Sequence, residues 1–254
     1  MLSESKAEKK NDSVFAKHIL SKEAMLEYLE KLSIGTDSHS FGHIMSSQGS
    51  QIKAAGLADF VIDYVDKRQL ADSGLWENAA NYSTMSGVIK VSGLYSSLGS
   101  RLKHSGKIIR SAIDVILSDE DPIYITYVFN PWGALGTAMR SADAESRDGV
   151  GDDYEALFKE VRAAFPAMID KTIEKLGKFR KPGGSYSYEQ PRSAPTTQGV
   201  PVSLGEFEGD VNGLACGLQY TIGGIFSALG LPRVKMCDEG DFEHFLDYIR
   251  NSYK

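Results

Sequence analysis

The chain is organised around the stretch PGGSYSYEQPRSAPTTQGVPVSLGEFEGDVNG, which runs from Pro182 to Gly213. Three further prolines, at positions 191, 195 and 201, exclude both a long helix and a central strand here. Its aromatic and branched residues give it more surface to bury than a solvated linker carries. Structureless loops of this length in a compact domain are usually functional, disordered or linkers. We therefore expect an ordered loop at 182–213, polar at its centre and lying across one end of a helical body.

The rest of the chain has the apolar spacing of helices. Apolar residues recur at helical intervals in 13–35, 57–69, 85–98, 108–116, 134–142, 154–176, 214–229 and 242–249. The run 123–129 has strand-forming residues, but its neighbours are helical, so we predict a buried helix there. Polar stretches at 36–50 and 143–153 are predicted as connections. The pattern predicts an all-α protein of eight to ten helices arranged as helical hairpins. Residues 1–12 are expected to form a disordered tail, and 13–254 a single domain.

Composition limits the classes of function. The chain has 254 residues, 42% of them hydrophobic, and a net charge of −6, without the dense cluster of Lys and Arg that binds nucleic acid. No segment is long and apolar enough to cross a membrane or to act as a signal peptide. The sequence therefore predicts a soluble cytoplasmic protein, exported only if a leader is missing. Cys216 and Cys237 match no metal spacing and are expected to be free thiols, and no cofactor or metal is implied.

Two segments share a pattern in which a helix leads into a turn with glycine and an aromatic residue. They read YVDKRQLADSGLW (residues 64–76) and IEKLGKFRKPGGSYSY (residues 173–188). Gly74 and Gly184 are about two helical hairpins apart, which indicates an internal repeat. The segment FLDYIRNSYK (residues 245–254) begins like the first copy and stops before its glycine, as a truncated third copy would.

This pattern resembles the glycine-tryptophan end of the helical repeat in terpenoid cyclases, protein prenyltransferases and polysaccharide lyases of the α/α-toroid class. The resemblance covers most of the chain as architecture. It implies helical hairpins that close into a ring, with the active-site cleft at the turns of one end. Gln69 precedes Gly74 by one residue more than the cyclase repeat has, and Tyr186 stands where a Trp is expected. Eight to ten helices are fewer than a closed ring contains, so the ring is open or the chain belongs to a longer enzyme.

The chemistry of cyclases and prenyltransferases fits these residues poorly, which places a terpenoid-cyclase-like protein third among the candidates. Ionising a diphosphate requires carboxylates that hold magnesium, and protonating an alkene requires an unusually acidic Asp. The acidic groups 119–121 and 152–153 fall in predicted turns, where solvated or capping roles are more common. Prenyltransferases also use zinc, and the Cys and His spacing indicates no zinc site.

A carbohydrate cleft fits better, because sugar-binding grooves in toroids resemble surfaces of aromatic rings, hydroxyls and amides. The candidate substrate-binding residues are His43, Trp76, Tyr82, Asn130, Trp132, Tyr186 and Gln190. A polysaccharide lyase requires a base and a cationic or amide group beside a uronate carboxylate, for which we consider Tyr188 and Arg192 with His43 or Asn130. A glycoside hydrolase requires two carboxyl groups, for which the loop offers Glu206, Glu208 and Asp210. The expected partner is an oligo- or polysaccharide.

Each candidate residue also has a structural interpretation. A Trp beside Gly or Pro, as at Trp76 and Trp132, is more often a packing anchor than a sugar platform. The three acids of the loop precede a predicted helix, where Asp210 would be a natural N-cap. His43 is more often a residue that braces a loop. The alternative function is therefore a non-catalytic helical-repeat module that binds a partner or a glycan, or a fragment of a larger toroid enzyme.

Overall fold

The computed structural model describes residues 16–181, 186–190, 196–197, 200–201, 213, 215–232 and 239–252. The predicted tail at 1–12 and Cys237 lie outside these residues. The elements are η1 (Lys17–Ile19), α1 (Lys22–Leu32), α2 (Ser38–Ser47), α3 (Gly49–Ala54), α4 (Ala58–Asp66), α5 (Tyr82–Leu98), α6 (Ser105–Leu117), α7 (Thr126–Arg147), α8 (Tyr154–Gly177), β1 (Thr196–Thr197), β2 (Val200–Pro201), the π-helical turn η2 (Ala215–Tyr220), α10 (Thr221–Ala228) and α11 (Glu239–Ser252).

The regular secondary structure of the described residues is helical, apart from β1 and β2, a pair of two-residue antiparallel strands, and two isolated bridges. This confirms the all-α prediction for these residues. None of the described helices is long and apolar enough to cross a membrane. Cys216 is a buried free thiol, as predicted.

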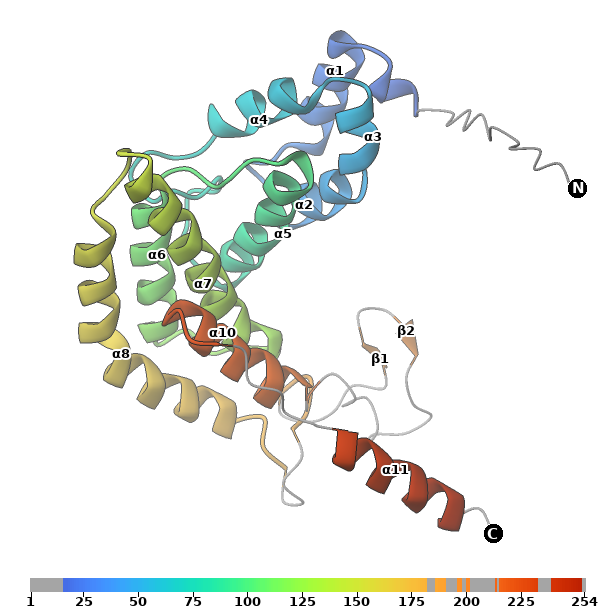
Figure 1. The fold of residues 1–254 in the computed structure, drawn as a ribbon, viewed down its shortest axis with the longest axis vertical. Helices are drawn as coiled ribbons and strands as arrows, with labels where there is room; N and C mark the ends of the chain where they lie inside the picture. Colours follow the sequence, from blue (N-terminus) through green and yellow to red (C-terminus); the bar gives the residue numbers. More distant parts are fainter. Residues whose placement is uncertain are drawn as a thin grey trace, which may run out of the picture.

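Four helices form a continuous row in which α2 packs on α5, α5 on α7, and α7 on α10. Figure 1 shows this row curving through the middle of the molecule, with α6 and α8 on the outer side of α7. The chain passes from inner α5 through outer α6 to inner α7, and then through outer α8 to inner α10. We call α2, α5, α7 and α10 the inner row. The side of the row away from α6 and α8 is concave (Figure 1).

The inner row is held close by glycine. At Gly42 in α2, an added Cβ would lie 2.5 Å from the backbone of Lys90 and Val91 in α5. Gly87 of α5 faces Ser38 of α2 in the same way, and Gly49 of α3 faces Ser97 of α5. A larger side chain at these positions would collide with backbone or with a serine. Glycine therefore allows α2 and α3 to approach α5 more closely than larger residues would.

Glycine residues also bring α7 and α10 close together. A Cβ at Gly224 would lie 2.8 Å from Cβ of Trp132, and one at Gly136 would lie 2.6 Å from Oγ of Ser227. Trp132 is fully buried between these helices and α8, where its indole N–H donates to Oγ1 of Thr172 at 2.9 Å. Pro131 lies within α7 beside it, and the helix continues through both residues.

Three local predictions are corrected by the structure. Residues 36–50 are not a connection: they contain α2, because Asp37 caps its first turn and Phe41 and Met45 fill the core. Residues 143–153 are not wholly a loop, because α7 continues to Arg147. The run 123–129 is helical only from Thr126, since Tyr124 forms an isolated bridge with Glu189 instead.

We predict that Gly42→Ala lowers the free energy of unfolding by about 2–3 kcal/mol, because the new methyl group meets α5 backbone that cannot move aside. The matched control is Gly93→Ala in α5, where the Cβ would find only ordinary contacts at 3.7 Å or more. This control should raise stability by about 0.5–1 kcal/mol, because Ala restricts the unfolded chain. Urea denaturation measures both values, and equal effects of the two substitutions would contradict the close-packing account.

Candidate functional site

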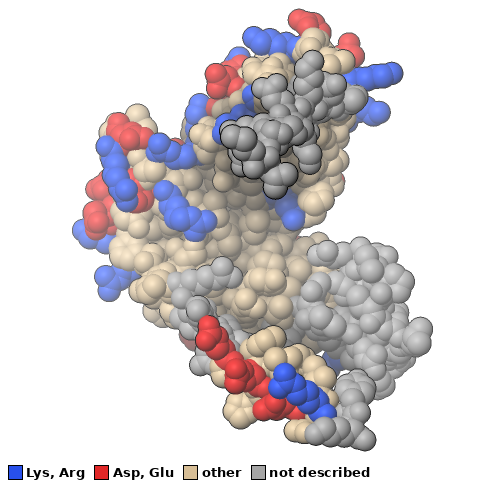
Figure 2. All heavy atoms as spheres, turned by 45° about the vertical axis from the view of Figure 1, so that its right-hand side comes forward, with Lys and Arg blue, Asp and Glu red and all other residues tan. Residues whose placement is uncertain are grey.

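A cleft of about 730 Å³ opens where the amino-terminal parts of three inner-row helices meet. It is lined by Thr36, Asp37, His39, Ser40 and His43 at α2, by Glu77, Ser83, Ser86, Ile89 and Lys90 at α5, and by Tyr124, Thr126, Tyr127, Phe129, Asn130 and Tyr188 at α7. Figure 2, in which the right-hand side of Figure 1 comes forward, shows a hollow bordered largely by uncharged residues.

Three helices begin beside this cleft, and the amino terminus of α2 is already met by the carboxylates of Asp37 and Glu77. Residues from the first turns of α2, α5 and α7 line the same space, so the three helices run in the same direction and direct their amino-terminal ends toward it. Asp37 caps α2 by accepting from the backbone N–H of Ser40 at 2.9 Å, and Asn81 caps α5 in a reciprocal capping box with Thr84. Helix amino termini favour bound anions, because their N–H groups and dipoles point outward.

One wall of the cleft is a chain of tyrosine rings. Tyr82 stacks on Tyr127 with a centroid distance of 5.3 Å, Tyr127 meets Tyr124 edge to face at 5.4 Å, and Tyr124 meets Tyr188 at 5.7 Å. Burial raises the pKa of Tyr127, and it raises the pKa of Tyr82 to about 12. Tyr82 and Tyr127 therefore stay neutral and do not form phenolates.

Residues 186–190 of the predicted long loop are tied to the start of α7. The backbone N–H of Ile125 donates to the carbonyl of Tyr188 at 3.0 Å, and the N–H of Gln190 donates to the carbonyl of Ile123 at 3.2 Å. The Gln190 amide also donates to the carbonyl of Pro122 at 2.6 Å. These bonds fix Tyr188, which is 7% exposed, at the edge of the cleft.

The facing wall carries basic groups. His39 and His43 lie one turn apart on α2, and Lys90 projects from α5 into the same space. The pKa of His39 is lowered, first by burial and then by the charges of Lys90 and His43, while Asp37 opposes the shift. The His39 imidazole is therefore neutral near pH 7 and able to accept a proton, because its pKa lies below the ordinary value of about 6.5.

The two carboxylates of the cleft, Asp37 and Glu77, accept hydrogen bonds from the first turn of α2. Hydrogen bonds from Ser40 lower the pKa of Asp37, so this group is an anion that caps the helix. Glu77 accepts from the N–H of Ser38 at 3.0 Å and from its hydroxyl at 2.5 Å through one oxygen, Oε1. Both carboxylates are therefore engaged as hydrogen-bond acceptors at the start of α2.

Asn130 lies at the floor of the cleft. Its Nδ2 donates to Oγ of Ser86 at 2.6 Å, and that hydroxyl donates to the carbonyl of Tyr82 at 3.0 Å. These bonds hold the amide in one orientation, and because an amide has two N–H donors, one is left to meet a ligand.

The structure brings together three of the predicted site residues, namely His43, Asn130 and Tyr188, in this one cleft. Tyr82 is buried beneath it, where its hydroxyl donates to the carbonyl of Glu120. Trp76 and Trp132 are core residues at 3% and 0% exposure, which fits packing and leaves no ring face for a sugar.

The remaining predicted residues lie apart from the cleft or outside the described chain. The Tyr186 ring packs against Gly217 of η2, and Gln190 ties the loop segment to Pro122. Arg192, Glu206, Glu208 and Asp210 lie outside the residues that the structure describes.

Sequence reasoning did not single out four residues that line the cleft, namely His39, Lys90, Tyr124 and Tyr127. His39 and His43 have the i, i+4 spacing that places two side chains on one helical face. That signal was available, but it has meaning only if 36–50 is helical, and the serines and glycine of this segment indicated a connection.

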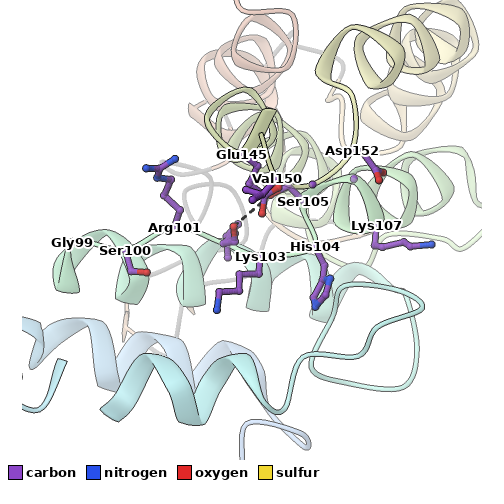
Figure 3. A pocket seen from close by; sticks show the side chains of 13 residues that line it. Gly99, Ser100, Arg101, Lys103, His104, Ser105, Lys107, Glu145, Val150 and Asp152 are labelled. Atoms are coloured by element: carbon purple, nitrogen blue, oxygen red, sulfur yellow. Dashed lines mark hydrogen bonds between the residues drawn. The ribbon is translucent and has the colours of Figure 1, made fainter. Parts of the chain in front are cut away.

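A second cavity of about 620 Å³ lies between residues 99–107 and the end of α7 (Figure 3). Glu145 and Ser105 meet near its centre, whereas the charged ends of Lys103 and Lys107 point away from each other. Burial raises the pKa of Glu145, and hydrogen bonds from Ser105 oppose the shift. The Glu145 carboxylate therefore binds the amino terminus of α6, and we interpret its role in this cavity as capping that helix.

Among the described residues, no three His, Cys, Asp or Glu side chains are placed to share one metal ion. Comparison of the chain with protein-family models, with curated proteins and with solved structures found no match. The functional argument therefore depends on the cleft itself, since a helical architecture by itself assigns no activity.

We predict that His39 titrates below about 6.5, the value of an unperturbed histidine. Lys90→Met should raise its pKa by removing a neighbouring cation, and Asp37→Asn should lower it further while retaining a capping side chain. NMR titration of the imidazole signals measures all three. A His39 pKa that does not respond to Lys90→Met would show that the two groups are not neighbours in the cleft.

Proposed function

We propose that this protein is a polysaccharide lyase that cleaves a uronate-containing polymer in the cleft between α2, α5 and α7. The observation that carries the proposal is the convergence of a histidine with a lowered pKa, a second histidine, a lysine, an oriented amide and a wall of tyrosines in one space. These are the groups that β-elimination beside a carboxylate requires.

The residues divide the proton transfers between them. His39, held neutral, removes the proton on the carbon next to the uronate carboxyl group. Lys90, His43 and Asn130 stabilise the negative charge that develops on that carboxylate. The electron pair forms a double bond as the glycosidic oxygen leaves, and Tyr188 donates a proton to that oxygen.

Hydrolysis is less well supported by the described residues. Inverting and retaining glycosidases both need a carboxylic acid that is protonated at the start of the reaction. Asp37 and Glu77 instead accept hydrogen bonds from the first turn of α2. The three acids of the loop, Glu206, Glu208 and Asp210, are the remaining hydrolase candidates in this proposal.

The arrangement of helices supports an open α/α-toroid-like architecture as part of the proposal. Helices alternate between the inner row and the side covered by α6 and α8, as the hairpins of such a ring do. Both copies of the glycine-aromatic pattern lie where the chain passes into an inner helix, from α4 to α5 and from α8 to α10. The cleft then occupies the inner face at one end, where toroid active sites are expected.

A non-catalytic binding module is the second candidate, and one observation favours it. No residue of α11 is buried, and four of its apolar side chains are exposed by 36–70%, namely Phe242, Phe245, Tyr248 and Ile249. An amphipathic helix with an open apolar face is typical of surfaces that bind another protein.

Incubation of the protein with acidic and neutral polysaccharides tests the proposal. We predict that acidic substrates yield products with the ultraviolet absorbance of an unsaturated uronate, together with new reducing ends. His39→Gln and Tyr188→Phe should each reduce the rate by at least about 100-fold, the usual contribution of general acid-base groups. His244→Gln on the exposed surface of α11 is the matched control and should leave the rate unchanged.

The alternatives give distinct results in the same assay. Reducing ends without the absorbance would indicate hydrolysis. Glycan binding without either product would favour the binding module, and unchanged rates in His39→Gln and Tyr188→Phe would contradict the assigned roles.

A further inference from the structure

A second hollow of about 470 Å³ lies beside the cleft, and Ile89 lines both. This hollow follows α5 and α7 toward their carboxyl ends. It is lined by Ile89, Ser92, Gly93, Tyr95, Ser96, Ser100, Arg101, Leu102, Thr137, Arg140 and Ser141. We call the cleft and this hollow together the inner groove.

One face of α7 contributes residues to the inner groove. On α7, Asn130, Gly133, Thr137 and Arg140 follow one another at intervals of three or four and so lie on one helical face. A Cβ at Gly133 would lie 3.0 Å from Cδ1 of Ile89, so glycine at this position makes room for the Ile89 side chain, which lines both the cleft and the hollow. Beyond that point the lining is mostly hydroxyl groups.

Arg140 brings a positive charge to the far end of the groove. Its guanidinium donates to Oγ1 of Thr137 at 3.0 Å and to Oγ of Ser227, and both partners are neutral hydroxyls. No carboxylate lines this hollow, and within the described chain Arg140 forms no ion pair, whereas neighbouring Arg101 pairs with Asp148 at 2.9 Å. Burial lowers the pKa of Arg140, as expected for a cation that is partly desolvated without a counter-charge.

An arginine that is exposed, charged and held by hydroxyls is suited to a ligand's carboxylate or sulfate group, because its planar fork binds such groups with two hydrogen bonds. From Asn130 to Arg140 the helix rises by about 15 Å at 1.5 Å per residue, which is several sugar units of an extended chain. We infer that the inner groove binds an acidic oligosaccharide along its length, with Arg140 as a distal subsite for an acidic group.

This inference rests on the proposed function, and it adds that the substrate is a polyanion recognised at more than one sugar. Its probes are the disaccharide and the hexasaccharide of polygalacturonate, which carry carboxylates alone, and the corresponding oligosaccharides of chondroitin sulfate, which also carry sulfates. Calorimetric titration of each probe into the wild-type chain and into Arg140→Met measures affinity, and the methionine keeps the apolar stem. Arg147→Met is the matched control, because Arg147 lies on the same helix but pairs with Asp143 outside the groove.

We expect the hexasaccharide to bind wild type more tightly than the disaccharide, and Arg140→Met to lose about tenfold in hexasaccharide affinity while leaving disaccharide affinity unchanged. Arg147→Met should match wild type, and Arg140→Lys should recover part of the loss. A larger effect of Arg140→Met on the chondroitin sulfate probe would identify sulfate as the preferred group, and a larger effect on polygalacturonate would identify carboxylate.

Equal hexasaccharide affinity in wild type and Arg140→Met would overturn the inference, and so would a wild-type chain that binds none of the probes. Thermal denaturation of Arg140→Met separates a binding defect from loosening of α10, which contacts Arg140 through Ser227. Failure of the lyase proposal alone has a different result, namely Arg140-dependent binding of the hexasaccharide without any unsaturated product.

Discussion

The close approach of α2 to α5 is the constraint on which the rest of the structure depends. Gly42 and Gly87 let the two backbones come together, and Gly136 and Gly224 do the same for α7 and α10. Because the contacts between these helices are made by glycine and serine, few long side chains project from the inner face of the row. The polar groove along α5 and α7 and the cleft at the helix ends both follow from this packing.

The residues of the cleft are brought together by the parallel direction of α2, α5 and α7 and by the backbone hydrogen bonds that hold residues 188–190 against residues 123–125. Since α2, α5 and α7 run the same way, their amino-terminal ends and the residues of their first turns collect at one place. The aromatic wall is completed from a distant part of the sequence, because backbone bonds from 123–125 to 188–190 bring Tyr188 against Tyr124. The lysine, the two histidines, the oriented amide and the aromatic wall of this cleft are the basis of the proposed lyase.

The sequence predicted the helical class, because long apolar periodicities such as that of 154–176 depend only on local spacing. It also pointed to His43, Asn130 and Tyr188, which three separate segments contribute to one cleft. It failed at 36–50, where serines and glycine indicated a loop, because helix α2 is stabilised by its packing against α5 rather than by local propensity. The burial of Trp76 and Trp132 fits the packing interpretation that the sequence favoured over sugar platforms. His39 and Lys90 were missed because they are adjacent only in the fold.

The central claim is that the inner groove is the binding site for an acidic polysaccharide. A crystal structure of His39→Gln with a bound polygalacturonate hexasaccharide tests it most directly, because a slow variant preserves the intact substrate. The account predicts sugar rings on the Tyr124 and Tyr127 wall, one carboxylate beside Lys90 and Asn130, and another at Arg140. Density for the oligosaccharide on the apolar face of α11, or anywhere outside the groove, would contradict it.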